Sequence, residues 1–274
     1  MGKNYYYLIA GLPDVSMEDT KPACSLSSFR EEYYAQLGSD DQRLVDLLYL
    51  ETDNANLLRL MAGGIMAEDG DGLYTEEELR TLIADARNDE KYRGRCPRYM
   101  YDFVQAEQRD ADGTPAAAFA SDRLAARYYA YAMNADNAFV ADWFRFNLRM
   151  NNVLTAITAR KYQLDRAAAV IGDDEVCEAL RTSAARDFGL AGTLDEMDEM
   201  LRIAETENLV EREHKIDALR WNWLEEHAFF KYFTVERLIA FLVKGQIAQR
   251  WALLDAEEGG RMLRAMVEEM KNNK

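Results

Sequence analysis

The sequence is poor in residues that break helices or crosslink chains. It has only 4 prolines in 274 residues, all before residue 116, so the rest of the chain contains no helix breaker of that kind. Its 3 cysteines are odd in number and far apart, which indicates a reducing cytoplasm rather than a disulfide framework. No stretch approaches the roughly 18 apolar residues of a membrane span. We therefore expect an all-α protein with no direct membrane insertion.

Basic residues are also scarce. The chain carries 33 Lys and Arg against 49 Asp and Glu, for a net charge of −16. Because Lys and Arg contacts to phosphate dominate nucleic-acid affinity, this balance argues against a nucleic-acid partner. Hydrophobic residues make up 49% of the chain, which is enough for a core. We expect a single elongated helical protein over 1–274, with candidate lobes 1–110, 111–190 and 191–274.

Apolar periodicity predicts long helices. Apolar residues recur every three or four positions along 194–227, which predicts one helix of about 34 residues and roughly 50 Å. A helix of that length indicates an elongated molecule. The segment 121–164 repeats the pattern and should break or kink at 134–137, where poor helix formers cluster. Capping-box sequences predict further helix starts, and these begin at Ser28, Ser39, Thr75 and Thr193.

Three segments share a short pattern in which an amide residue precedes an apolar one within a helical stretch. The amides are Asn56, Asn152 and Gln246, and the intervals between them are 96 and 94 residues. Near-equal spacing is the signature of an internal repeat. Chance remains an alternative, because pairs of this kind are common. The pattern predicts a weak threefold internal repeat.

Catalytic and cofactor motifs are missing. The chain has no phosphate-binding loop, no dinucleotide fingerprint and no nucleophile elbow. We therefore predict no catalytic residue, no cofactor and no metal ligand, so that the protein is not an enzyme. The alternative is a helical metal-binding protein or enzyme. It would be built around Glu211 and His214, which have the spacing of a di-iron helix, or around the acidic loop 67–78, which partly matches a calcium loop.

The charges are distributed unevenly along the chain. Basic residues outnumber acids in 143–166, whereas acids dominate 193–227. The two blocks could pair with each other, or each could offer a surface of one sign to a partner. On the second interpretation, the candidate partner contacts are Arg145, Arg149, Arg160 and Lys161.

Three stretches carry a resemblance to a known family. They are Tyr-Tyr-Tyr-Leu-Ile-Ala-Gly-Leu-Pro at 5–13, Ser-Phe-Arg-Glu-Glu at 28–32 and Asp-Asn-Ala-Asn-Leu-Leu at 53–58. With these the chain resembles an uncharacterised bacterial family that is encoded among the components of V/A-type ATPases. Its members are encoded in the place where the rotor-cap subunit, called C, or d in eukaryotes, is expected.

The three amide segments are also similar to a pattern in the rotor-cap subunit of V-type ATPases, which has three related lobes. In that pattern, each lobe carries an acidic or polar residue near an Asn-Ile pair on a helix. The third segment departs from it, with Gly245-Gln246 in place of an acid and Asn.

The resemblance implies a mechanical function. The rotor-cap subunit is a helical funnel that covers the membrane rotor ring and receives the foot of the central stalk, so it passes torque without bond chemistry. The implied protein is a non-enzymatic adaptor whose partners are the central-stalk subunits and the rotor ring. It would lie in the cytoplasm, peripheral to the inner membrane through those partners. A transient assembly factor of the same ATPase is the alternative.

Overall fold

The computed structural model describes residues 5–19, 24–67, 72–110 and 119–254. These ranges hold twelve α-helices and one 3₁₀ helix, and they contain no strand, which confirms the all-α class. The chain divides into two compact units, one formed by 1–42 with 224–274 and the other by 43–223. The three predicted lobes stay a prediction.

The first unit contains the two ends of the chain. Its elements are α1 (Tyr6–Ala10), α2 (Leu26–Glu32), the 3₁₀ helix η1 (Tyr34–Gln36) and α12 (Val235–Leu253). It also includes the start of α3 (Ser39–Met61) and the end of α11 (Leu209–Ala228). The apolar side of α12 forms much of its core, with buried residues that include Leu238, Ile239, Leu242 and Val243.

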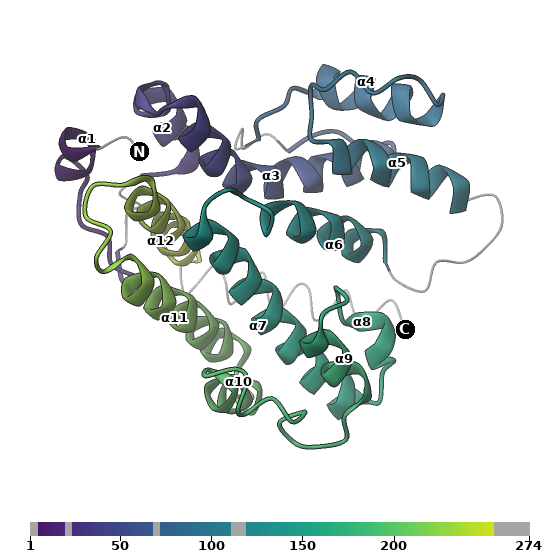
Figure 1. The fold of residues 1–274 in the computed structure, drawn as a ribbon, viewed down its shortest axis with the longest axis vertical. Coiled ribbons are helices and arrows are strands. Elements are labelled where there is room, and N and C mark those ends of the chain that lie inside the picture. Colours follow the sequence, from purple (N-terminus) through teal and green to yellow (C-terminus); the bar gives the residue numbers. More distant parts are fainter. Residues whose placement is uncertain (1–4, 20–23, 68–71, 111–118, 255–274) are drawn as a thin grey trace. The chain divides into compact units, whose positions relative to one another are not determined.

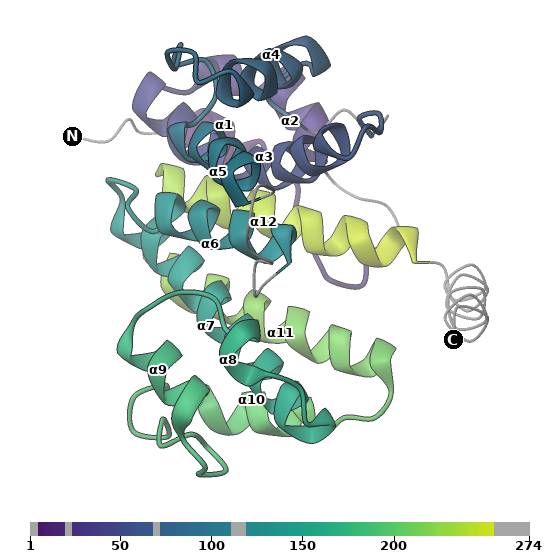
Figure 2. The same cartoon turned by 90° about the vertical axis from the view of Figure 1, so that its right-hand side faces the viewer.

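The second unit contains the remaining helices. In chain order they are most of α3, then α4 (Glu76–Arg87), α5 (Arg98–Asp110), α6 (Ala120–Ala132), α7 (Ala138–Tyr162), α8 (Arg166–Ala169), α9 (Glu175–Thr182), α10 (Met197–Ala204) and most of α11. The central element is α7, which packs against α6, α8, α9 and α10 (Figures 1 and 2). Aromatic rings strengthen this core: Trp223 of α11 stacks on Phe146 of α7 with the ring centroids 5.4 Å apart.

The predicted single helix over 194–227 is wrong. The chain forms α10 and α11, separated at residues 205–208. Asn208 is the cause, because its side chain accepts the backbone N–H of Glu211 at 2.9 Å and so starts a new helix. The helix start at Thr193 is also wrong, since α10 begins at Met197 after a turn. An unbroken apolar stripe therefore does not guarantee an unbroken helix.

Other helix boundaries agree with the sequence. The predicted break at 134–137 is confirmed between α6 and α7, where the Asn137 side chain accepts the Val140 N–H at 3.1 Å. Thr75 forms the predicted capping box with Glu78 at the start of α4. The box at Ser28 lies one turn earlier, because Ser25 caps α2 and Ser28 is its reciprocal partner. Within the described ranges, every helix is too short or too polar to span a bilayer.

Candidate functional site

The first candidate site is a polar clamp on α3. Asp53 has no exposed surface, although it lies in the apolar middle of a helix. Its carboxylate accepts the backbone N–H groups of Leu73 at 3.0 Å and Tyr74 at 3.2 Å. One turn further on, the buried Asn56 accepts the N–H of Ala67 at 3.1 Å. The connection that leads to α4 is therefore tied to α3 at two points, and each buried acceptor has a partner.

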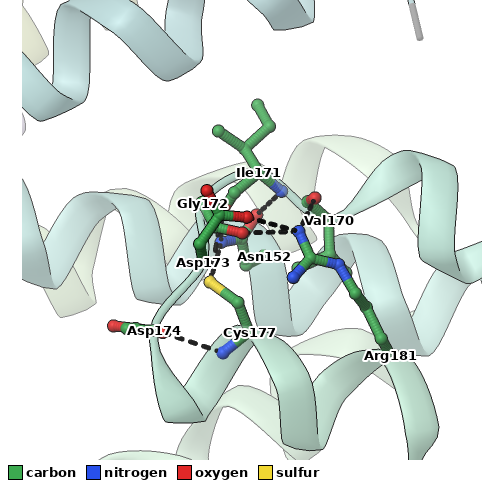
Figure 3. Close-up of polar contacts among 8 residues, drawn as sticks. All are labelled: Asn152, Val170, Ile171, Gly172, Asp173, Asp174, Cys177 and Arg181. Carbon is green, nitrogen blue, oxygen red and sulfur yellow. Dashed lines mark hydrogen bonds and ion pairs between the residues drawn. The ribbon is translucent and has the colours of Figure 1, made fainter. Parts of the chain in front are cut away.

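The second candidate site is a clamp on α7 (Figure 3). The buried Asn152 donates from Nδ2 to the carbonyl of Ile171 at 2.6 Å and accepts the N–H of the same residue at 3.0 Å. The side-chain amide of Asn152 therefore donates one hydrogen bond to the backbone of Ile171 and accepts another from it, as two paired residues do in a β-sheet. Arg181 also donates to the carbonyls of Val170, at 2.9 Å, and Gly172. The connection from α8 to α9 is thereby held by α7 through Asn152 and by α9 through Arg181.

A glycine completes each clamp. A Cβ at Gly72 would lie 2.5 Å from a carboxylate oxygen of Asp53, so only glycine lets this backbone approach α3. Gly172 has φ +98°, and a Cβ there would lie 3.2 Å from Sγ of Cys177. Each clamped segment then leads into a capped helix, through Thr75 in the first case and Asp174 in the second.

The two clamps occur at the first two of the three predicted repeat positions. Asn56 and Asn152 each lie in a long helix and each hold the backbone of a later connection. For Asn56 this is the connection that follows its own helix, whereas for Asn152 it is the connection between α8 and α9. The third position differs. Gln246 in α12 is half-buried, and its neighbour Gly245 packs so closely that an added Cβ would lie 3.0 Å from the carbonyl of Cys24. Similar backbone contacts are therefore described at two of the three repeat positions and not at the third.

The four predicted partner-contact residues lie on α7 and mostly engage the second unit itself. Arg145 pairs with Asp142 on the same helix. Arg149 approaches Asp174 at 3.8 Å, which links α7 to the cap of α9. Arg160 donates to the carbonyl of Ala185 at 2.9 Å, and its guanidinium lies 3.8 Å from the ring centroid of Phe188. Lys161 is exposed. A role for these residues in partner contact stays a prediction.

Charge and solvation at Arg160 also fit a structural role. Burial, together with the nearby positive charge of Arg166, lowers the pKa of the Arg160 guanidinium. Phe188, which Arg160 covers, is buried and has φ +58°. Arg166 reaches the same ring and donates to the carbonyl of Ser183 at 2.9 Å. The two arginines thus hold the segment 183–188 against the end of α7.

Of the two alternative metal sites, the pair Glu211 and His214 lies within the described residues, whereas the acidic loop does so only in part. Glu211 forms an ion pair with Lys215 at 2.6 Å, and His214 is exposed. In the acidic loop 67–78, residues 68–71 lie outside the described residues, and these include Asp69 and Asp71. Over the described ranges, no group of three or more His, Cys, Asp or Glu side chains is arranged to hold a metal ion.

The three cysteine thiols are buried, and burial disfavours their thiolate form. Burial raises the pKa of Cys177 to about 11 and that of Cys96 to about 12, and it also raises the pKa of Cys24. A nucleophilic cysteine needs the opposite shift, because the thiolate is the reactive form. The Cys177 thiol instead donates to the carbonyl of Ile171 at 3.2 Å and so joins the second clamp.

A buried polar network beside the second clamp was not predicted from the sequence. Arg220 of α11 donates to Asn147 at 3.0 Å and to Asn151 at 3.3 Å, both on α7. It also pairs with Asp217, which has 1% of its side chain exposed. The available signal was a set of polar residues within apolar helical stripes. Sequence alone could not pair them, since they are separated by about 70 residues in the chain.

The fold and the clamps define an all-α protein whose buried polar side chains bind its own backbone. The chain belongs to the family described as "Protein of unknown function (DUF2764)", whose model matches residues 1–274. No curated protein and no solved structure matches it.

Proposed function

We propose that the protein is a non-enzymatic adaptor of a V/A-type ATPase, similar to the rotor-cap subunit, and that it couples the central stalk to the membrane rotor ring. The observation that carries the proposal is the repeated clamp, in which Asn56 and Asn152 each lie in a long helix and hold the backbone of a later connection. The resemblance of segments 5–13, 28–32 and 53–58 supports it. The adaptor would lie in the cytoplasm, peripheral to the inner membrane through its partners.

The clamps suit a part that transmits force. Helices resist bending because their backbone hydrogen bonds are internal, whereas connections between helices are the segments that open first under load. Asp53 and Asn152 remove that weakness by binding backbone groups of the connections inside the protein. A close-packed unit braced in this way transmits strain instead of absorbing it.

Affinity purification tests the proposal. The tagged full-length chain, expressed in its own cells and solubilised in mild detergent, should co-purify stalk and ring subunits in a fixed ratio. A transient assembly factor would give a substoichiometric ratio that falls as complexes mature. If no ATPase component is recovered above the level of an untagged strain, the proposal is wrong.

A matched pair of variants tests the mechanical part. Asn152→Ala removes the clamp on Ile171, whereas Asn151→Ala removes only contacts of 3.3 Å to Tyr129 and Arg220. In membranes from cells that carry each variant, we expect ATP hydrolysis to persist in both. Ion pumping per ATP should fall only in Asn152→Ala. Equal coupling in the two variants would contradict a mechanical role for the clamp.

A further inference from the structure

Exposed aromatic side chains lie on two adjoining segments of the first unit. Two come from α1 and three from the connection between α11 and α12, and we call them the aromatic cap: Tyr6, Tyr7, Phe229, Phe230 and Tyr232. Tyr7 is 91% exposed and Phe230 is 79% exposed. Isolated exposed apolar residues are common on protein surfaces, but a cluster of large rings marks an interaction site.

The two segments of the cap are joined directly. The N–H of Tyr5 donates to the carbonyl of Phe233 at 2.8 Å, and the Tyr6 and Phe233 rings lie 4.6 Å apart. Phe229 and Phe230 also contact each other edge to face, with centroids 4.9 Å apart. Figure 1 shows α1 beside the chain that links α11 to α12. The two segments that carry the cap therefore meet at Tyr5, Tyr6 and Phe233, although they are more than 200 residues apart in the sequence.

Buried contacts of Tyr5 and Leu8 fix the position of the aromatic cap. Tyr5 is buried, and its hydroxyl donates to the carboxylate of Asp41 and accepts the N–H of Gly38 at 3.1 Å. Burial and the Asp41 contact raise the pKa of this hydroxyl to about 12, so it stays a donor near neutral pH. Leu8 is also buried under α1. The rings are presented on an ordered base, which lowers the entropy lost on binding.

The charges near the aromatic cap and over the whole chain indicate which kind of partner the cap can bind. Exposed Glu226 and Lys231 flank the rings with opposite signs, so the rings dominate contact at the cap itself. The chain as a whole has a net charge of −16, which opposes approach to an anionic lipid surface or to a second copy of the chain. Aromatic faces and an acidic protein both favour Lys and Arg, the first through cation–π contact.

A partner surface rich in Lys and Arg fits this chemistry, and the cytoplasmic loops of membrane proteins are surfaces of that kind. We propose that the aromatic cap docks on the basic cytoplasmic loops of the membrane ring. This inference rests on the adaptor function proposed above and assigns the ring-facing surface within it. In that interface Tyr7 and Phe230 would be the anchor side chains, because they are the two most exposed residues of the cap.

The test compares two double variants of the full-length chain. The cap variant is Tyr7→Ala with Phe230→Ala. The control is Phe119→Ala with Tyr162→Ala, which removes two rings of similar exposure, 80% and 63%, from the second unit. Each protein is immobilised, and binding of the purified ring in detergent is measured alongside thermal melting. We expect the cap variant to bind the ring at least about tenfold more weakly and to melt like the wild type. The control should bind as the wild type does.

Each other outcome has a defined meaning. If the wild-type chain recovers no ATPase component from cells, the adaptor function fails and the inference fails with it. If it recovers them but the cap variant binds the ring like the wild type, only the inference is overturned. Equal weakening in the control also overturns it. So does cap-dependent flotation with phosphatidylglycerol vesicles that lack the ring, because the cap would then bind lipid. Should the double variant melt early, Tyr7→Ala and Phe230→Ala are measured singly.

Discussion

Replacing Asn152 with alanine is the sharpest test of the second clamp. The side chain is buried, and its amide makes both hydrogen bonds to the backbone of Ile171, at 2.6 Å and 3.0 Å. Alanine removes the donor and the acceptor together. The N–H of Ile171 then loses its partner, and its carbonyl keeps only the weak bond from the Cys177 thiol at 3.2 Å, while the surrounding helices keep their hydrogen bonds. The perturbation is therefore local to the connection between α8 and α9.

The expected cost follows from those two groups. An unsatisfied buried backbone group costs about 1–3 kcal/mol. Ile171 is only half-buried, so the lower part of that range applies to each group. We expect the free energy of unfolding of the second unit to fall by about 2–3 kcal/mol in Asn152→Ala. At about 2–4 °C per kcal/mol, this corresponds to a loss of about 4–12 °C in melting temperature.

Urea unfolding and hydrogen exchange measure this effect together. Because a chain with two units need not unfold in one step, exchange at the amide of Ile171 reports on the clamp directly. Asn151→Ala is the control, since this neighbour is half-buried and its hydrogen bonds are 3.3 Å long. It should cost less than about 1 kcal/mol. If both variants unfold alike, or if the Ile171 amide stays protected in Asn152→Ala, the reasoning about the clamp is refuted.

Three further predictions concern stability. Asp53→Asn turns one acceptor into a donor that faces backbone N–H groups, so it should cost about 1–3 kcal/mol in urea unfolding, and an unchanged midpoint would count against the first clamp. Gly172→Ala should lower the free energy of unfolding by about 1–3 kcal/mol, because of the positive φ of Gly172 and the contact of the added Cβ with Cys177. Gly192→Ala is the control, since nothing lies within 4 Å of its added Cβ, and it should stay within about 0.5 kcal/mol of the wild type. Similar values for both variants would contradict the strain argument. Burial raises the folded-state pKa of Cys177 from 9.0 to about 11 and of Cys96 from 9.0 to about 12, so the folded protein binds these protons more tightly than the unfolded chain. Their contribution to stability is complete below pH 9 and is lost as the pH rises from 9 through 11 and 12, so urea midpoints should fall between pH 8 and pH 11, and a flat profile would exclude the shift.

The extent of prediction from sequence differs between elements. The break before α7 was predictable because Asn137 is a local capping signal and its bond spans three residues. The break before α11 depends on the same chemistry at Asn208, but the apolar stripe on both sides of it favoured a continuous helix. The two signals conflict there, and the side-chain cap prevailed over the periodicity.

The candidate site was also predictable only in part from the sequence. The spacing of Asn56 and Asn152 in the sequence identified both residues, but it could not identify what they bind. Their partners lie 11 and 19 residues further along the chain, at Ala67 and Ile171. The residue three before each amide differs as well, since Asp53 holds backbone N–H groups whereas Arg149 approaches the carboxylate of Asp174.

The sequence by itself determined the helical class, several helix ends and the positions of the two clamp amides, because proline content, capping residues and apolar spacing act over a few neighbouring residues. Only the tertiary structure decided which backbone groups the amides hold and which rings stay uncovered. Those outcomes depend on packing between distant segments, as when the Tyr5 amide meets the carbonyl of Phe233 and brings the rings of the aromatic cap together.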